Sequence, residues 1–147
     1  MMISQLILEE KRAIPKKFHT NLNNRDFDKQ YELITDNIKF YKNGQLIQGA
    51  DNFVNALRSI TASFEDAQVA DHEIYADGNV AVSRYVMSGS LTGDITFPDG
   101  TSASKTQKAF TYNSVEFFEF NEDGLVYEIR QVNDSGLTPL SIEAQVK

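Results

Sequence analysis

The most constraining feature of the sequence is a series of extended segments in its second half. Beyond Asp66, residues 69–75, 80–88, 106–120 and 125–132 are rich in β-branched and aromatic side chains, and turn sequences at 76–79 and 121–124 separate them. Such segments favour strands, and short polar turns that contain glycine favour hairpins. The second half therefore predicts an antiparallel meander, with residues 91–105 as a long connection over the rim of the sheet.

The first half carries helical periodicity instead. Apolar residues recur at helical spacing over 4–22, where Pro15 predicts either a kink or a helix that begins near it. We expect a short helix capped by Asp26 and then a brief strand over 38–41. The strongest helix prediction follows Gly49. Its apolar side is formed by Phe53, Val54, Leu57, Ile60 and Phe64.

The expected helices come first in the chain and the antiparallel strands follow. This order is typical of an α+β fold in which helices cover one face of a curved sheet. The length of 147 residues suits one core, so we expect residues 1–147 to form a single domain. A curved antiparallel sheet wrapped around N-terminal helices leaves a cone-shaped pocket, and such pockets hold small molecules. A small-molecule ligand is therefore the expected partner.

The composition excludes several classes of function. Because the chain has no cysteine, it has no disulfide, no thiolate zinc site and no cysteine nucleophile. A net charge of −7 with scattered basic residues argues against nucleic acid. No segment approaches the roughly 20 apolar residues that span a bilayer, and no metal-ligand or dinucleotide motif occurs. We expect a cytoplasmic protein that has no metal ion or cofactor and binds neither nucleic acid nor membranes.

Short motifs follow one another in a fixed order along nearly the whole chain. They lie at 24–27, 49–53, 64–66, 77–82, 89–93, 120–126 and 134–137. In order and spacing they resemble the SnoaL-like polyketide cyclase and ester cyclase group of the nuclear transport factor 2-like superfamily. The resemblance implies a cone-shaped pocket, frequent homodimers formed through the outer face of the sheet, and an acid/base aspartate at the end of the last strand. That aspartate corresponds to Asp134.

The last predicted strand supplies the catalytic candidates. Its period of two places Glu128, Arg130 and Asp134 on one face. Burial in an apolar pocket suits a carboxylate such as Asp134 to move a proton next to a carbonyl group, and Arg130 would orient an oxygen or bind an anion. Each has an alternative: Asp134 lies in a turn-like sequence, and Arg130 can pair with Glu116 or Glu119 of a neighbouring strand.

Five residues are candidates for ligand binding. They are Tyr85, Tyr112, Phe117, Glu128 and Leu91. Tyr85 or Tyr112 would donate a hydrogen bond, while the aromatic residues either line a pocket for a flat apolar ligand or form ordinary sheet core. The sequence departs from the family pattern at Leu91, where the family has a histidine, and at Arg130, where it has a tryptophan.

The two histidines are alternative general bases, because imidazole titrates near neutral pH. His72 lies between Asp71 and Glu73, so a solvated face is its expected environment. His19 follows Phe18 on the first predicted helix and can point inward instead.

Two hypotheses for function remain open from the sequence. One is a cofactor-free cyclase, isomerase or hydrolase that uses acid/base chemistry on a small carbonyl compound. The other is a non-catalytic ligand-binding or dimerisation module that keeps the same fold. The sequence leaves open whether the protein is an enzyme and which face of the alternating strands lines the pocket.

Overall fold

The computed structural model describes residues 7–90, 95–96, 102–103 and 109–133. The helices are α1 (Leu8–Asn23), α2 (Phe27–Gln30), the 3-10 helix η1 (Tyr31–Leu33) and α3 (Ala50–Ser63). The strands are β1 (Ile34–Lys42), β2 (Gln45–Gln48), β3 (Gln68–Asp77), β4 (Val80–Ser90), β5 (Ile95–Thr96), β6 (Ser102–Ala103), β7 (Ala109–Phe120) and β8 (Val126–Asn133).

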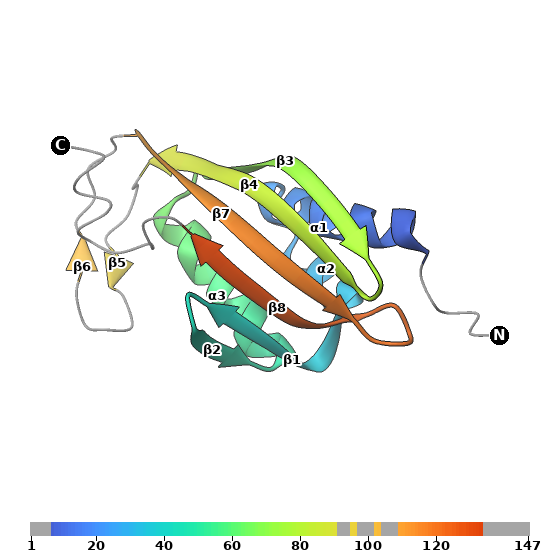
Figure 1. The fold of residues 1–147 in the computed structure, drawn as a ribbon. Helices are drawn as coiled ribbons and strands as arrows, with labels where there is room; N and C mark the ends of the chain where they lie inside the picture. The colour runs from blue at the N-terminus through green and yellow to red at the C-terminus, as the bar shows by residue number, and fades with distance from the viewer. Residues whose placement is uncertain (1–6, 91–94, 97–101, 104–108, 134–147) are drawn as a thin grey trace.

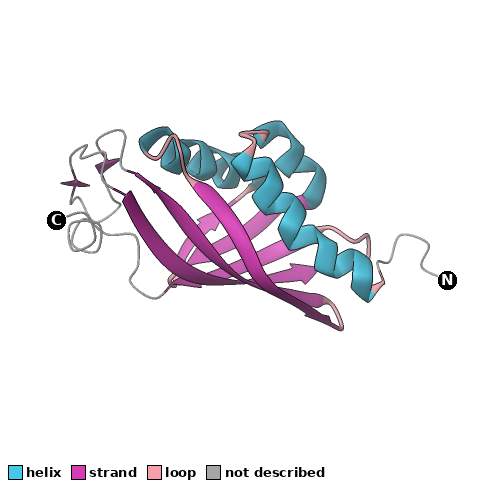
Figure 2. Cartoon of the chain, turned by 90° about the horizontal axis from the view of Figure 1, so that it is seen from above, coloured by secondary structure: helices cyan, strands magenta, loops and turns pink. Residues whose placement is uncertain are grey.

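Six strands form one curved sheet in the order β2-β1-β8-β7-β4-β3 (Figure 1). Only β1 and β8 pair in parallel; the other neighbours in this sheet are antiparallel. The helices lie together on one face of the sheet, and the described part of the chain places no helix on the other (Figure 2). This arrangement confirms the α+β fold with helices on one side of a curved sheet.

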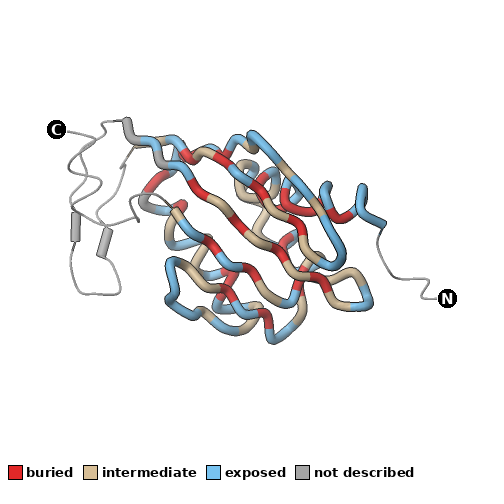
Figure 3. Tube along the Cα trace, viewed as in Figure 1, coloured by how far each residue is buried: buried red, intermediate tan, exposed pale blue. Residues whose placement is uncertain are grey.

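The core lies between the helices and the concave face of the sheet. Buried and exposed positions alternate along the strands (Figure 3). Phe118 of β7 and Ile129 of β8 are both almost completely buried, and they face the helices that carry Phe18 and Phe53. Complete burial of one such side chain contributes roughly 1.5–3 kcal/mol relative to its exposure. The alternation therefore fixes which strand positions can reach a site on the helical side.

Helix α1 runs through Pro15 rather than beginning there. It starts at Leu8, and Pro15 is buried inside it together with Ile14 and Phe18. A proline within a helix removes one hydrogen bond and costs roughly 3 kcal/mol. Packing of this apolar face against the sheet offsets that cost. Of the two alternatives expected at Pro15, the helix that begins near it is therefore wrong.

Arg25 joins the end of α1 to the connection between α3 and β3. Its guanidinium donates hydrogen bonds to the backbone oxygens of Leu22, Phe64, Glu65 and Ala67, at 2.7, 3.3, 2.7 and 3.0 Å. Its own backbone has φ of 60°, an uncommon conformation for a residue with a side chain. These contacts fix the position of α1, which carries His19.

The boundaries of several elements differ from expectation. Strand β1 begins at Ile34 rather than 38, and the four-residue β2 was not predicted. Asp26 precedes α2 without a side-chain capping bond. In the described part of the chain, no helix is long and apolar enough to span a membrane.

Candidate functional site

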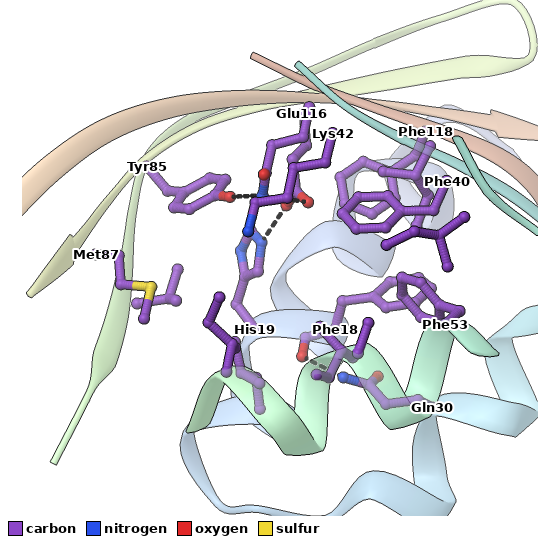
Figure 4. A pocket seen from close by; sticks show the side chains of 18 residues that line it. Phe18, His19, Gln30, Phe40, Lys42, Phe53, Tyr85, Met87, Glu116 and Phe118 are labelled. Atoms are coloured by element: carbon purple, nitrogen blue, oxygen red, sulfur yellow. Dashed lines mark hydrogen bonds and ion pairs between the residues drawn. The ribbon is translucent and has the colours of Figure 1, made fainter. Parts of the chain in front are cut away.

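A cavity of about 100 Å3 lies between the helices and the concave face of the sheet. A water molecule needs roughly 10–15 Å3 of such space, so the cavity can hold several waters or a small organic molecule. Most of its lining is apolar. The exceptions are His19, Gln30, Lys42, Tyr85, Glu116 and Gln131. Phe40, Phe53 and Phe118 lie on one side of this polar group, and Met87 lies on the other (Figure 4).

A row of polar side chains crosses the concave face of the sheet. Lys42 on β1 is in register with Gln131 on β8. Gln131 is in register with Glu116 on β7, which is in register with Ser83 on β4. Side chains at register positions on neighbouring strands share a face. The row therefore brings an ammonium, an amide, a carboxylate and a hydroxyl group together from four separate segments.

His19 of α1 lies between two carboxylates. Its Nδ1 is 2.7 Å from Oδ1 of Asp71 on β3. Its Nε2 is 2.7 Å from Oε1 of Glu116, as Figure 4 shows. All three side chains are largely buried. A carboxylate only accepts hydrogen bonds, so both imidazole nitrogens must carry a proton to satisfy both partners. The geometry thus favours an imidazolium held by two negative charges.

The groups around His19 shift the pKa values of both His19 and Asp71. Burial lowers the pKa of His19, but the hydrogen bonds and charges of Asp71 and Glu116 outweigh it and raise the value from 6.5 to about 9. Burial likewise raises the pKa of Asp71, yet the bond to His19 and the hydroxyl of Ser83 hold it below its ordinary value. His19 is therefore cationic at neutral pH, and with its two carboxylates the cluster carries one net negative charge.

Asp71 faces the site from β3, directly before a bulge in that strand. The register with β4 shifts between Asp71 and Glu73, which leaves His72 as the extra residue on the bulged strand. Asp71 points toward His19 and also accepts a hydrogen bond from Ser83 at 2.6 Å. Glu73 instead pairs with Arg84 at 3.0 Å in an exposed position, and His72 is exposed. Bulges often redirect side chains next to functional sites.

Tyr85 and Gln131 extend the cluster along the wall of the cavity. Gln131 donates a hydrogen bond to the hydroxyl oxygen of Tyr85 at 2.6 Å and makes a longer contact of 3.4 Å with Glu116. Within the described residues, its own side-chain oxygen is buried and has no partner. An unpaired buried acceptor is costly, so this oxygen is a natural contact for a ligand that donates a hydrogen bond.

The structure places Tyr85 in the cavity but directs three other candidates away from it. On β8, Ile129 and Gln131 face the helices, so Glu128 and Arg130 occupy the outer face. Arg130 is half exposed and pairs with Glu119 at 3.3 Å, which is the alternative that the sequence allowed. Its guanidinium carbon also lies 5.3 Å from the centre of the Phe117 ring. The charged face of the last strand is thus the outer one.

The remaining candidates are not placed. Asp134 and Leu91 lie outside the described residues, and for Tyr112 the described structure covers only the backbone of β7. Their roles stay predictions. Among the described residues, no group of three or more histidine and acidic side chains is arranged to hold a metal ion.

Sequence reasoning named His19 but missed its partners. Asp71 and Glu116 lie 52 and 97 positions away in the chain, so no local pattern joins the three residues. One signal was present in β7, where Glu116 occupies the same alternating face as Ser114 and Phe118. A carboxylate in an otherwise buried row marks a position that needs a buried partner.

Comparisons with known proteins support the same fold. The model of the SnoaL-like domain family matches residues 16–129. No curated protein matches the chain in sequence. TsrD from Streptomyces laurentii has a TM-score of 0.78 at 18% identity, over 97% of this chain and 98% of that one.

Two further solved structures are similar. A SnoaL-like polyketide cyclase from Agrobacterium tumefaciens has a TM-score of 0.70 at 18% identity, over 91% of this chain and 95% of that one. A nuclear transport factor 2-like protein of unknown function from Exiguobacterium has a TM-score of 0.64 at 19% identity, over 83% and 98%. At these identities the likeness establishes the fold, and the chemistry has to be argued from the site.

Proposed function

The chain belongs to the SnoaL-like domain family, and we propose that its cavity binds a small, largely apolar carbonyl compound and moves a proton on it. The reaction would be a cofactor-free cyclisation, isomerisation or hydrolysis. The observation that carries the proposal is the pair of carboxylates that share one buried imidazolium at the wall of an apolar cavity.

Glu116 is the proposed proton acceptor. It lines the cavity, and its second carboxylate oxygen has only the long 3.4 Å contact with Gln131 among the hydrogen bonds of the described residues. When Glu116 takes a proton, Asp71 still neutralises His19. Two carboxylates for one imidazolium therefore allow one of them to change its charge without leaving a buried cation unpaired. Tyr85 lies on the same wall, where it would contact the carbonyl oxygen of the substrate.

Exchange of carbon-bound hydrogen for deuterium tests this proposal directly. The protein is incubated in deuterated buffer with small cyclic ketones, β-keto esters and lactones, and loss of the proton signals next to the carbonyl is followed by NMR. A positioned general base accelerates such a step by roughly 10²–10⁴-fold. We expect Glu116→Gln to lose the acceleration, and Glu73→Gln, which changes an exposed carboxylate of β3, to keep it.

Two results would contradict the proposal: exchange no faster than in buffer for every compound of the panel, or equal exchange by the wild type and Glu116→Gln. Circular dichroism and thermal unfolding of both variants separate loss of the base from loss of the fold.

A non-catalytic binding module is the second candidate. The observation in its favour is that both nitrogens of His19 are already bonded at 2.7 Å, as in a cluster that only holds α1 on the sheet. In that case compounds of the panel would shift the methyl signal of Met87, which lines the cavity, without any hydrogen exchange.

We further propose a homodimer formed through the outer face of the sheet. In the described part of the chain this face has no helix over it, and it carries Tyr127 and Val132 as exposed apolar side chains beside the half-buried Phe117. Exposed apolar patches of this kind mark interfaces. Sedimentation equilibrium at micromolar concentration should give twice the chain mass, and Val132→Lys should lower it. A monomeric mass for the wild type would exclude the dimer.

A further inference from the structure

Lys42 enters the cavity from the end of β1. Ile38 and Phe40 precede it at alternating positions and are buried in the core, whereas Lys39 between them is exposed. The register of Lys42 with Gln131 places it on the same concave face, and it lines the cavity. The strand thus directs a primary amine into an apolar space.

The surroundings of this amine are unlike those of a surface lysine. No hydrogen bond or ion pair of the Lys42 side chain occurs among the described residues, and Glu116 lies beside it (Figure 4). The titratable groups that share its cavity are His19 of α1, Tyr85 of β4 and Glu116 of β7, with Asp71 of β3 behind His19. The residues that α3 contributes to the lining are all apolar. They are Phe53, Ala56, Leu57 and Ile60.

Burial lowers the pKa of Lys42, and the negative charge of Glu116 offsets only part of that effect. A larger fraction of the side chain is therefore an uncharged amine near neutral pH than for a lysine in water. Desolvation in an apolar pocket is the usual way in which a lysine becomes a nucleophile.

We propose that Lys42 forms a covalent imine with a small ketone or aldehyde bound in the cavity. The nitrogen lone pair forms a bond to the carbonyl carbon while the carbonyl π electrons move to oxygen. A proton passes from nitrogen to oxygen to give a carbinolamine. The hydroxyl group then takes up one proton from the solvent, the nitrogen lone pair forms the second carbon–nitrogen bond as the carbon–oxygen bond breaks, and the oxygen leaves as water, so that the product is an iminium ion. No oxidant or reductant is needed.

This step rests on the proposed function in one respect, since both need a carbonyl compound in the same cavity, but it uses a different group. An iminium ion draws electrons from the adjacent carbon more strongly than a ketone does. Glu116 lies in the same row of side chains, one strand beyond Gln131. Removal of the adjacent proton by Glu116 would convert the iminium ion to an enamine and leave nitrogen neutral.

Reductive trapping tests the proposal. The full chain is incubated with cyclopentanone and sodium cyanoborohydride near pH 8, and the modified lysines are located by peptide mass mapping. We expect one cyclopentyl group per chain, carried by Lys42 at more than ten times the level found on Lys39, an exposed lysine of the same strand. Lys42→Arg should carry none, and Lys39→Arg should be modified like the wild type.

Modification spread evenly over the lysines, or no modification of Lys42 in the folded wild type, would overturn the proposal. Thermal unfolding of Lys42→Arg, which keeps the positive charge, shows that the cavity is intact. The two proposals fail separately. Trapping at Lys42 of the wild type without hydrogen exchange would contradict the acid/base function and keep the imine, whereas hydrogen exchange by the wild type with no trapping at its Lys42 would contradict the imine alone.

Discussion

Raising the pH through the pKa of His19 will remove most of the stabilisation that its protonated cluster provides. The imidazole has an ordinary pKa of 6.5, and in the folded protein the value is about 9. Because the folded state binds this proton more tightly than the unfolded state, the stabilisation is complete below pH 6.5 and is lost as the pH rises through 9. The values differ by about 2.5, so at about 1.4 kcal/mol for each pKa unit the loss is about 3–4 kcal/mol.

Urea unfolding measured at a series of pH values from about 6 to about 10 tests this expectation. The chain has no tryptophan and has six tyrosines, so circular dichroism is the suitable signal. His19→Gln lacks the titrating group and should lose much less stability over the same range. His72→Gln removes the exposed imidazole of the β3 bulge and should follow the wild type.

A direct titration by NMR decides between the cluster and other sources of pH dependence. Labelled histidine gives two imidazole signals, and His72→Gln assigns them. The signal of His19 should change with a midpoint near 9. A midpoint at or below 6.5, or an equal loss of stability in His19→Gln, would refute the reasoning from its two carboxylates.

Two further substitutions test the scaffold. Phe118→Ala removes a buried ring whose centre lies 5.3 Å from that of Phe18. Urea unfolding should show that the free energy of unfolding falls by about 3–5 kcal/mol, and by less for Phe118→Leu. A decrease below about 1 kcal/mol for Phe118→Ala would contradict the packing. Arg25→Met removes the hydrogen bonds from the guanidinium to four backbone oxygens and should lower the free energy of unfolding by about 2 kcal/mol. Arg12 forms an exposed ion pair with Glu9 at 3.9 Å, so Arg12→Met should change the free energy of unfolding by no more than about 0.5 kcal/mol. Equal effects of the two arginine substitutions would argue against the role of Arg25.

Most of the fold followed from the sequence because its elements have strong local patterns. Helix α3 was predicted from one apolar side and a glycine at its start, where Gly49 has φ of 97°. Strands β3, β4, β7 and β8 were predicted from their composition and the turns between them. Strand β2 has four residues and follows a tight turn, so it offers too little alternation to be recognised. Of the two alternatives for Pro15, a helix that begins near it was wrong because tertiary packing outweighs helix propensity.

The site was less accessible to sequence reasoning, for two physical reasons. Alternation on β8 separates Arg130 from Gln131, but both faces of the strand carry apolar residues, so the pattern alone could not say which face lies inside. The bulge at His72 then breaks the period of two in β3. The expected solvated environment of His72 was right, but the neighbouring Asp71 faces inward and binds His19.

The cluster around His19 holds α1 against the sheet and also presents Glu116 to the cavity, and these two roles place different demands on its charge. A single carboxylate would give the imidazolium one partner, and protonation of that partner would leave a buried cation unpaired. With Asp71 on the far side of the ring, the contact between α1 and β3 survives a change of charge on Glu116. The second carboxylate therefore separates holding the helix from the proposed proton transfer, so Asp71→Asn should weaken the fold at neutral pH even where Glu116 remains intact.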